Sequence, residues 1–280
     1  MQELLLPERG EVGKMKGEIE KALLIQRQEQ LGGWDGSFGR VQFGCECCER
    51  LLPSKAELLA VKKFCGKKGI MFSFVTPYLT DAGLRDVMRL LPLLGGDDEL
   101  VVNDFGLLDR AKRGGFHIAA GRLLNRQYRD PRIPSFKGKV PHDFYAHLQQ
   151  SHAGSKRFRK LLLLNRVERV ELDNLPQGIG TKLNGSGLSG SLHFPFLFVS
   201  TGRMCLTANC DKISFHNKIG IFPCSMECKR CQFALRNKMF PAELFLFGNS
   251  IFSRNNSLPA REKLLRLGID RIVTNKSLQL

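Results

Sequence analysis

Short apolar segments alternate with amphipathic helical segments along this chain of 280 residues, and the alternation limits the folds open to it. Each apolar segment has the length of a buried strand in a parallel sheet, about 4 to 6 residues. We expect such strands at residues 4–6, 40–43, 70–75, 100–103, 167–172, 194–199, 244–247 and 269–274. Helices are expected between them at 54–64, 84–94 and 259–267, where apolar side chains recur with helical spacing.

Roughly eight strands separated by helices or long connections predict an α/β fold, a (β/α)8 TIM-like barrel of regular or irregular form. A doubly wound sheet is the alternative. A chain of 280 residues can bury one large core, and barrels of this length commonly form one domain. We therefore expect a single domain over residues 1–280, with two small domains as the alternative.

The formal net charge of +16 favours an anionic partner, which is a nucleic acid, a membrane surface or an acidic substrate. No apolar run reaches the roughly 18 to 20 residues that cross a bilayer, so no membrane span is expected. Residues 1–9 contain acidic side chains and a proline and lack the apolar stretch of a signal peptide. These features predict a cytoplasmic protein.

Nine cysteines in a cytoplasmic chain favour metal binding or catalysis, because that compartment keeps thiols reduced. Five of them fall within residues 202–231 and follow a predicted strand: Cys205, Cys210, Cys224, Cys228 and Cys231. Several thiols this close along the chain can converge on one metal centre. A cysteine-rich metal-binding region at 202–231 is therefore the strongest functional signal in the sequence.

The pattern alone leaves the metal open, because thiolates bind both iron–sulfur clusters and structural zinc. A zinc ribbon prefers paired Cys-x-x-Cys units, and within this region only Cys228 and Cys231 have that spacing. An iron–sulfur cluster is thus modestly favoured, and zinc is the alternative. A third reading treats the cysteines as small buried apolar residues.

A second group of thiols, Cys45, Cys47 and Cys48, follows the strand expected at residues 40–43. Residues just beyond the strand ends of a barrel share one face. This group is therefore expected beside the later cysteines, where one member supplies a fourth ligand. Cys65 lies beside the helix expected at 54–64, and we expect it to be a packed residue.

With these cysteines in view, the chain resembles the collagenase-like peptidase family U-thirty-two (peptidase U32). The resemblance extends over most of the chain through segments 3–7, 41–44, 100–106, 121–125 and 130–132. It continues through Arg203-x-Cys205-Leu and through Cys224-x-x-x-Cys228. The pattern is most similar to the branch of anaerobic ubiquinone-biosynthesis accessory proteins.

That resemblance implies a 4Fe-4S cluster held by Cys48, Cys205, Cys224 and Cys228. Cys48 matches the early ligand because it stands four residues after Gly44, as in the family pattern. Cys210 and Cys231 are extra thiols and are the alternative ligands. The resemblance further implies oxygen-independent hydroxylation or related redox chemistry, with a second family member as a heterodimer partner. Members labelled as peptidases leave peptidase activity as another alternative.

Polar residues at the ends of other predicted strands are candidates for catalysis. Asn103 and Asp104 end the strand at 100–103, and Glu171 and Asp173 end the strand at 167–172. Catalytic side chains of barrels occupy such positions. The remaining candidates are histidines: His193 and His117, which are more often structural residues, and His216 within the cysteine region.

A basic segment at residues 121–139 suggests RNA as an alternative partner. Its cations are Arg122, Arg126, Arg129, Arg132, Lys137 and Lys139, and Tyr128 and Phe136 lie between them. Such a mixture can neutralise phosphates and stack bases. The competing interpretation is a solvated cationic loop. RNA binding or RNA modification is therefore the second functional hypothesis.

Overall fold

The computed structural model describes residues 17–212, 219–220, 223–238, 240 and 242–276. Eight parallel strands close into a barrel, as the sequence predicts, with β1 hydrogen-bonded to both β2 and β12. The strands are β1 Glu20–Ile25, β2 Arg40–Gly44, β3 Met71–Val75, β4 Glu99–Val102, β5 His117–Ala120, β6 Val167–Asp173, β7 Ser189–Phe194 and β12 Ile269–Thr274. The fold is therefore a TIM-like (β/α)8 barrel; its single-domain organisation stays a prediction.

Two of the strands expected from the sequence do not belong to the barrel. The segments at 194–199 and 244–247 enter a four-stranded antiparallel sheet with the order β8-β11-β10-β9. Its strands are β8 Phe196–Thr201, β9 Phe233–Leu235, β10 Leu244–Phe247 and β11 Ser250–Arg254. The expected strand at 4–6 lies outside the described residues. β1, β5 and β7 take barrel positions that the sequence analysis left unassigned.

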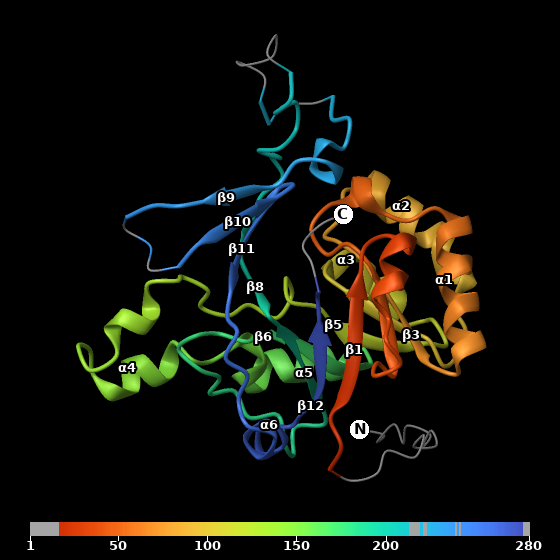
Figure 1. Ribbon diagram of the computed structural model, residues 1–280. Helices are drawn as coiled ribbons and strands as arrows, with labels where there is room; N and C mark the ends of the chain where they lie inside the picture. The colour runs from red at the N-terminus through yellow and green to blue at the C-terminus, as the bar shows by residue number, and fades with distance from the viewer. Residues whose placement is uncertain (1–16, 213–218, 221–222, 239, 241, 277–280) are drawn as a thin grey trace.

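This antiparallel sheet is inserted between β7 and β12, the last two barrel strands. Figure 1 shows it beyond the end of the barrel toward which the arrows of β1 and β12 point. That end carries the carboxyl ends of the parallel strands, where the active sites of barrel enzymes are built. The insertion therefore covers the face of the barrel that is suited to a functional site.

The α-helices of the described chain are α1 Lys55–Lys68, α2 Asp81–Leu90, α3 Phe105–Ala111, α4 His142–His147, α5 Lys156–Leu164 and α6 Arg261–Leu267. Short 3-10 helices are η1 Gln28–Gly33, η2 Glu49–Leu51, η3 Leu91–Leu93, η4 Ile133–Phe136, η5 His152–Gly154 and η7 Glu227–Lys229. Ser54 caps α1 in a reciprocal capping box with Glu57. α2 ends before η3, whose second residue is Pro92, because proline cannot continue an α-helix.

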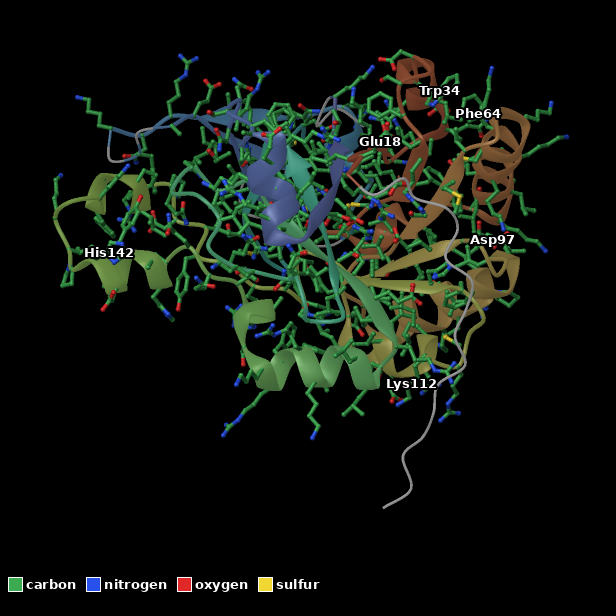
Figure 2. The ribbon with its side chains drawn as sticks, turned by 90° about the horizontal axis from the view of Figure 1, so that it is seen from below. Glu18, Trp34, Phe64, Asp97, Lys112 and His142 are labelled. Carbon is green, nitrogen blue, oxygen red and sulfur yellow. The ribbon has the colours of Figure 1, made fainter. Side chains whose placement is uncertain are left out.

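The main apolar core lies between the barrel strands and the surrounding helices. At the rim of this core, the ring of Trp34 packs edge to face against the ring of Phe64, which belongs to α1. The ring centroids are 5.7 Å apart, and Figure 2 shows the two side chains next to each other. Cys65 is buried in this core, which confirms that it packs there. The helices thus cover the barrel from outside through ordinary hydrophobic packing.

The interior of the barrel is partly ionic. Glu99 accepts hydrogen bonds from Arg271 at 2.7 and 3.0 Å, and Arg40 and Arg169 lie within 4 Å of the same carboxylate. Burial by itself raises the pKa of Glu99, but the three guanidinium groups hold it below its usual range. Arg40 and Glu99 are the first residues of β2 and β4, so this ionic layer lies toward the amino end of the barrel, away from the carboxyl end that the insertion covers. No described helix is long and apolar enough to cross a membrane.

Gly44 is required where β2 ends and the early cysteines begin. Its φ is +136°, and a Cβ at this position would collide with the backbone carbonyl of Val75. Replacing Gly44 by Ala should lower the free energy of unfolding by about 3 kcal/mol, through backbone strain and this collision. Chemical denaturation of both proteins measures the difference.

Gly39, just before the same strand, is the matched control. No described residue lies within 4 Å of a Cβ built on it. Gly39→Ala should therefore change stability by less than about 0.5 kcal/mol. Equal effects of the two substitutions would contradict the role given to Gly44.

Candidate metal centre

Two groups of cysteines that are far apart in the sequence line one cavity at the carboxyl end of the barrel. The cavity has a volume of about 230 Å³. Its cysteines are Cys45, Cys47, Cys48, Cys205, Cys224 and Cys228. Other lining residues include Tyr78, Arg203, Met226 and Asn249. The expectation that the early thiols lie beside the later ones is confirmed by this shared lining.

The early cysteines are positioned by the turn that follows β2. Glu49 connects this turn to the loop after β3. The Glu49 carboxylate accepts hydrogen bonds from the backbone N–H of Thr80 at 2.7 Å and from the Thr80 hydroxyl at 2.9 Å. Thr80 itself caps α2. The loop that carries Cys48 is therefore fixed to the loop after β3.

Asn249, in the turn between β10 and β11, joins the early and late parts of the cavity wall. Its side-chain amide lies 2.8 Å from the carbonyl of Cys47, 2.7 Å from the carbonyl of Gly202 and 2.8 Å from the hydroxyl of Tyr78. The hydroxyl of Tyr78 donates in turn to the carbonyl of Gly202 at 2.6 Å. Together these contacts hold the antiparallel sheet against the cysteine loop of the barrel.

The later cysteines enter the cavity from the segment between β8 and β9. Cys224 and Cys228 flank the start of η7, and the sulfur of Cys224 accepts a hydrogen bond from the N–H of Met226 at 3.3 Å. The sulfur of Cys205 lies 3.2 Å from the hydroxyl of Thr207. Polar groups therefore contact two of the sulfurs directly.

Crowding of thiols in this buried site changes their acidity. Burial raises the pKa of Cys48 to about 12, and the nearby thiolates of Cys45, Cys205 and Cys224 add to the increase. Burial also raises the pKa of Cys228 to about 12, with Cys205 as the largest of its charged neighbours. The thiols thus act on one another across the cavity, and a bound cation would relieve their repulsion as thiolates.

The two alternative thiols have a different environment. Cys210 and Cys231 form a hydrogen bond with each other, and burial together with this contact raises the pKa of Cys210 to about 11. Neither residue lines the cavity of the six cysteines. His216, the histidine expected near the centre, lies outside the described residues.

The six sulfurs are spread around the cavity. Within the described part of the chain, one group of three or more histidine, cysteine or carboxylate ligand atoms lies mutually within 4.8 Å, and it contains no cysteine. Tetrahedral zinc with Zn–S bonds of about 2.3 Å requires sulfurs about 3.8 Å apart. No three of the cavity sulfurs are that compact.

Asn103 and Asp104 have structural partners in the described chain. The amide of Asn103 donates to the carbonyl of Thr76 at 2.9 Å and accepts from the N–H of Leu123 at 2.9 Å. Asp104 caps α3 by accepting from the N–H of Leu107 at 3.0 Å. Both also line a second cavity of about 480 Å³, which shares Tyr78 with the cysteine cavity. Their catalytic role stays a prediction.

Glu171 lies inside the barrel instead of on an open surface. It is fully buried, and its carboxylate contacts the side chains of Gln42 and His193, each at 2.8 Å. The catalytic role of Glu171 likewise stays a prediction. His117, the other barrel histidine, pairs with Glu168 on the outside at 2.6 Å.

Arg122 is the centre of an ion network that the sequence analysis missed. Its guanidinium binds both carboxylate oxygens of Glu46, the residue between Cys45 and Cys47, and donates to Asp173 at 2.8 Å. Asp173 also accepts from Arg129 at 2.6 Å and from the N–H of Phe198 at 2.9 Å. The network therefore connects the cysteine loop, the end of β6 and the start of the antiparallel sheet.

The same contacts bear on the basic segment at 121–139. Arg122 and Arg129 are engaged by buried carboxylates, and Arg132 pairs with Asp130. Arg126, Lys137 and Lys139 are exposed. Half of the cations that suggested RNA thus have a structural partner. The only signal for Arg122 in the sequence was its place in a segment resembling the family.

Comparisons with known proteins give no family assignment. No family model and no curated protein matches the chain. Among solved structures, "The Structure of the U32 Peptidase Mk0906" has a TM-score of 0.44 at 11% identity, covering 99% of this chain and 98% of that one. A glycoside hydrolase family 18 N-acetylglucosaminidase from Paenibacillus barengoltzii has a TM-score of 0.34 at 10% identity, covering 92% and 94%. Neither score reaches 0.5, so the two likenesses establish neither family nor activity.

Substituting Arg122 tests the ion network. Arg122→Lys keeps the charge but cannot bridge Glu46 and Asp173 with a planar fork, so it leaves buried carboxylate oxygens without donors. The free energy of unfolding should fall by about 3 kcal/mol. Arg132→Lys, in the exposed pair with Asp130, should change it by less than about 0.5 kcal/mol. Denaturant titration compares the two, and a stable Arg122→Lys protein would contradict the network's role.

Proposed function

We propose that the cysteine cavity binds a 4Fe-4S cluster and that the protein carries out oxygen-independent hydroxylation or related redox chemistry. The observation that carries the proposal is the convergence of six cysteines on one cavity, from two segments more than 150 residues apart in the sequence. Thiolates are the usual ligands of such clusters. The resemblance of the cysteine motifs to the peptidase U32 family points to the same cofactor.

The ligands in this proposal are Cys48, Cys205, Cys224 and Cys228. Among the early thiols Cys48 is preferred, because its charge interacts with those of Cys205 and Cys224. The thiol of Cys47 instead hydrogen-bonds with Cys45 and Ser250. Cys45 remains the rival for the early position, since its charge acts on Cys228.

The spread of the sulfurs supports a cluster over the zinc alternative. Four iron atoms at the corners of a cluster separate their cysteine ligands more widely than one zinc ion does. Contacts of the kind seen at Cys224 and Cys205 would also tune such a cluster, since hydrogen bonds to sulfur shift its reduction potential. A zinc site would require at least three of these sulfurs to move closer together than they are here.

The cluster, when bound, supplies an electron-transfer or substrate-activating centre. The chain would shield the cluster from water, because Phe247, Met226 and Leu51 line the cavity with apolar side chains. Tyr78 stands between this cavity and the one lined by Asn103 and Asp104. We therefore place the substrate in that second cavity, next to the cluster.

The other hypotheses have less support. No observation in the described part of the chain favours peptidase activity or RNA modification over redox chemistry, and three cations of the basic segment already have carboxylate partners. A cytoplasmic location and a heterodimer with a second family member rest on the sequence alone.

Removing single ligands tests the proposal. Protein purified without oxygen should contain about four irons per chain and absorb as a 4Fe-4S protein. Serine at Cys48, Cys205, Cys224 or Cys228 should remove most of this iron, because each variant leaves a cluster corner without a thiolate. Iron and zinc contents are measured by elemental analysis, together with the absorption spectrum.

Cys231→Ser is the matched control, because Cys231 belongs to the same segment and lies outside the cavity. It should retain the iron of the unmodified protein, as should Cys210→Ser. One zinc per chain without iron would overturn the proposal. Retention of iron by all four ligand variants would show that the cluster lies elsewhere.

A further inference from the structure

Three ionisable side chains meet inside the barrel, apart from the cysteine sulfurs. Glu46 follows β2, Glu171 lies on β6, and His193 lies on the neighbouring strand β7. One potential ligand atom from each lies within 4.8 Å of the other two. The residues are 4%, 0% and 2% exposed, so the group is enclosed by protein. Surface acidic clusters are common, but an enclosed group of this composition requires compensation of its charge.

Gln42 of β2 gives an independent indication of a ligand. Its side chain is fully buried, and its Nε2 donates to Glu171 Oε1 at 2.8 Å. Its other amide atom, Oε1, is buried and has no hydrogen-bond partner among the described residues. Rotating the amide would place that oxygen against the Glu171 carboxylate, so two acceptors would face each other. The amide is therefore oriented with Nε2 toward Glu171, and this orientation leaves an unpaired acceptor oxygen on a residue that contacts the group.

The charges around the group also leave room for a cation. Three carboxylates are buried in this part of the barrel, those of Glu46, Glu171 and Asp173. The guanidinium groups of Arg122 and Arg129 pair with two of them. The arginines engage Glu46 and Asp173. Within the described residues, the ion-pair partner of Glu171 is His193, at 2.8 Å. A proton on His193 or a metal ion between the two side chains would balance the remaining negative charge.

We propose that this group is a binding site for a divalent transition-metal ion, with ligands from Glu46, Glu171 and His193 and with Gln42 Oε1 as a fourth ligand atom. Carboxylate, amide and imidazole donors suit Mn²⁺, Fe²⁺ or Zn²⁺. Each carboxylate oxygen of Glu46 has a second lone pair beyond its bond to Arg122. The ion lies between the Glu171 carboxylate and the His193 ring, whose contacting atoms are 2.8 Å apart in this structure.

This site is distinct from the cysteine cavity, because it contains no thiolate. The two are neighbours in the chain, since Glu46 stands between Cys45 and Cys47. A metal ion here could polarise a substrate oxygen or lower the pKa of a bound water. The barrel would then combine a redox centre with a Lewis acid, but the ion site stands whether or not the cavity holds a cluster.

Mn²⁺ is a suitable probe, because it prefers oxygen and nitrogen donors and binds thiolates poorly. Protein stripped of loosely bound metal with EDTA, without oxygen, is titrated with Mn²⁺, and the free ion is followed by its electron paramagnetic resonance signal. The wild-type protein should bind about one Mn²⁺ per chain. Glu171→Gln and Gln42→Met should each weaken binding at least about tenfold.

Glu168→Gln is the control. Glu168 lies on β6, the strand that also carries Glu171, and forms an exposed pair with His117 of β5. It should leave Mn²⁺ binding unchanged. Circular dichroism checks that the variants are folded. If a variant does not fold, the wild-type titration still decides: failure to bind Mn²⁺ at this stoichiometry overturns the proposal. Equal binding by wild type and by folded Glu171→Gln overturns it as well.

Discussion

The bridge that Arg122 forms between Glu46 and Asp173 is the interaction on which the geometry of the site depends. Glu46 belongs to the loop of early cysteines, and Asp173 ends β6 and receives the N–H of Phe198 from β8. One buried guanidinium thus holds together the barrel and the inserted sheet. The Glu46 and Asp173 carboxylates keep the pKa of Arg122 above its usual range although burial lowers it, so the bridge stays charged.

Asn249, which lines the cavity, provides a second connection between the barrel and the inserted sheet. Its contacts with Cys47, Gly202 and Tyr78 join the inserted sheet to the loops after β2 and β3. The later cysteines come from the same insertion, so fixing the sheet also fixes their approach to Cys48. The cavity is therefore a product of tertiary contacts, and neither cysteine segment could form it alone.

The sequence predicted those parts that depend on local pattern. β2, β3, β6, β12 and α1 were predicted because apolar runs and caps identify them. β7, with the sequence SGSLHF, was not predicted as a strand, because its inward side chains are polar and it contains no apolar run. β8 and β10 were recognised as strands, but a run of apolar residues does not specify the partner strand, so they were assigned to the barrel instead of the insertion.

The same limit applies to the site. The sequence analysis predicted that both cysteine groups would meet, because the strand ends of a barrel share a face. They do meet, but the later group follows β8 of the inserted sheet and reaches this face through the insertion. The roles of Gln42 and Asn249 could not be predicted, because each depends on contacts with residues far away in the sequence. Glu46 offered one signal, its position between two cysteines, but its partners Arg122 and His193 become apparent only in the folded chain.

The central claim is that the cavity of six cysteines holds an iron–sulfur cluster. A crystal structure of protein kept free of oxygen, with anomalous data collected at the iron absorption edge, tests it most directly. The account predicts a strong peak from several iron atoms inside the cavity, in bonding contact with Cys48, Cys205, Cys224 and Cys228. A single peak at the zinc edge, or iron located away from these sulfurs, would contradict it.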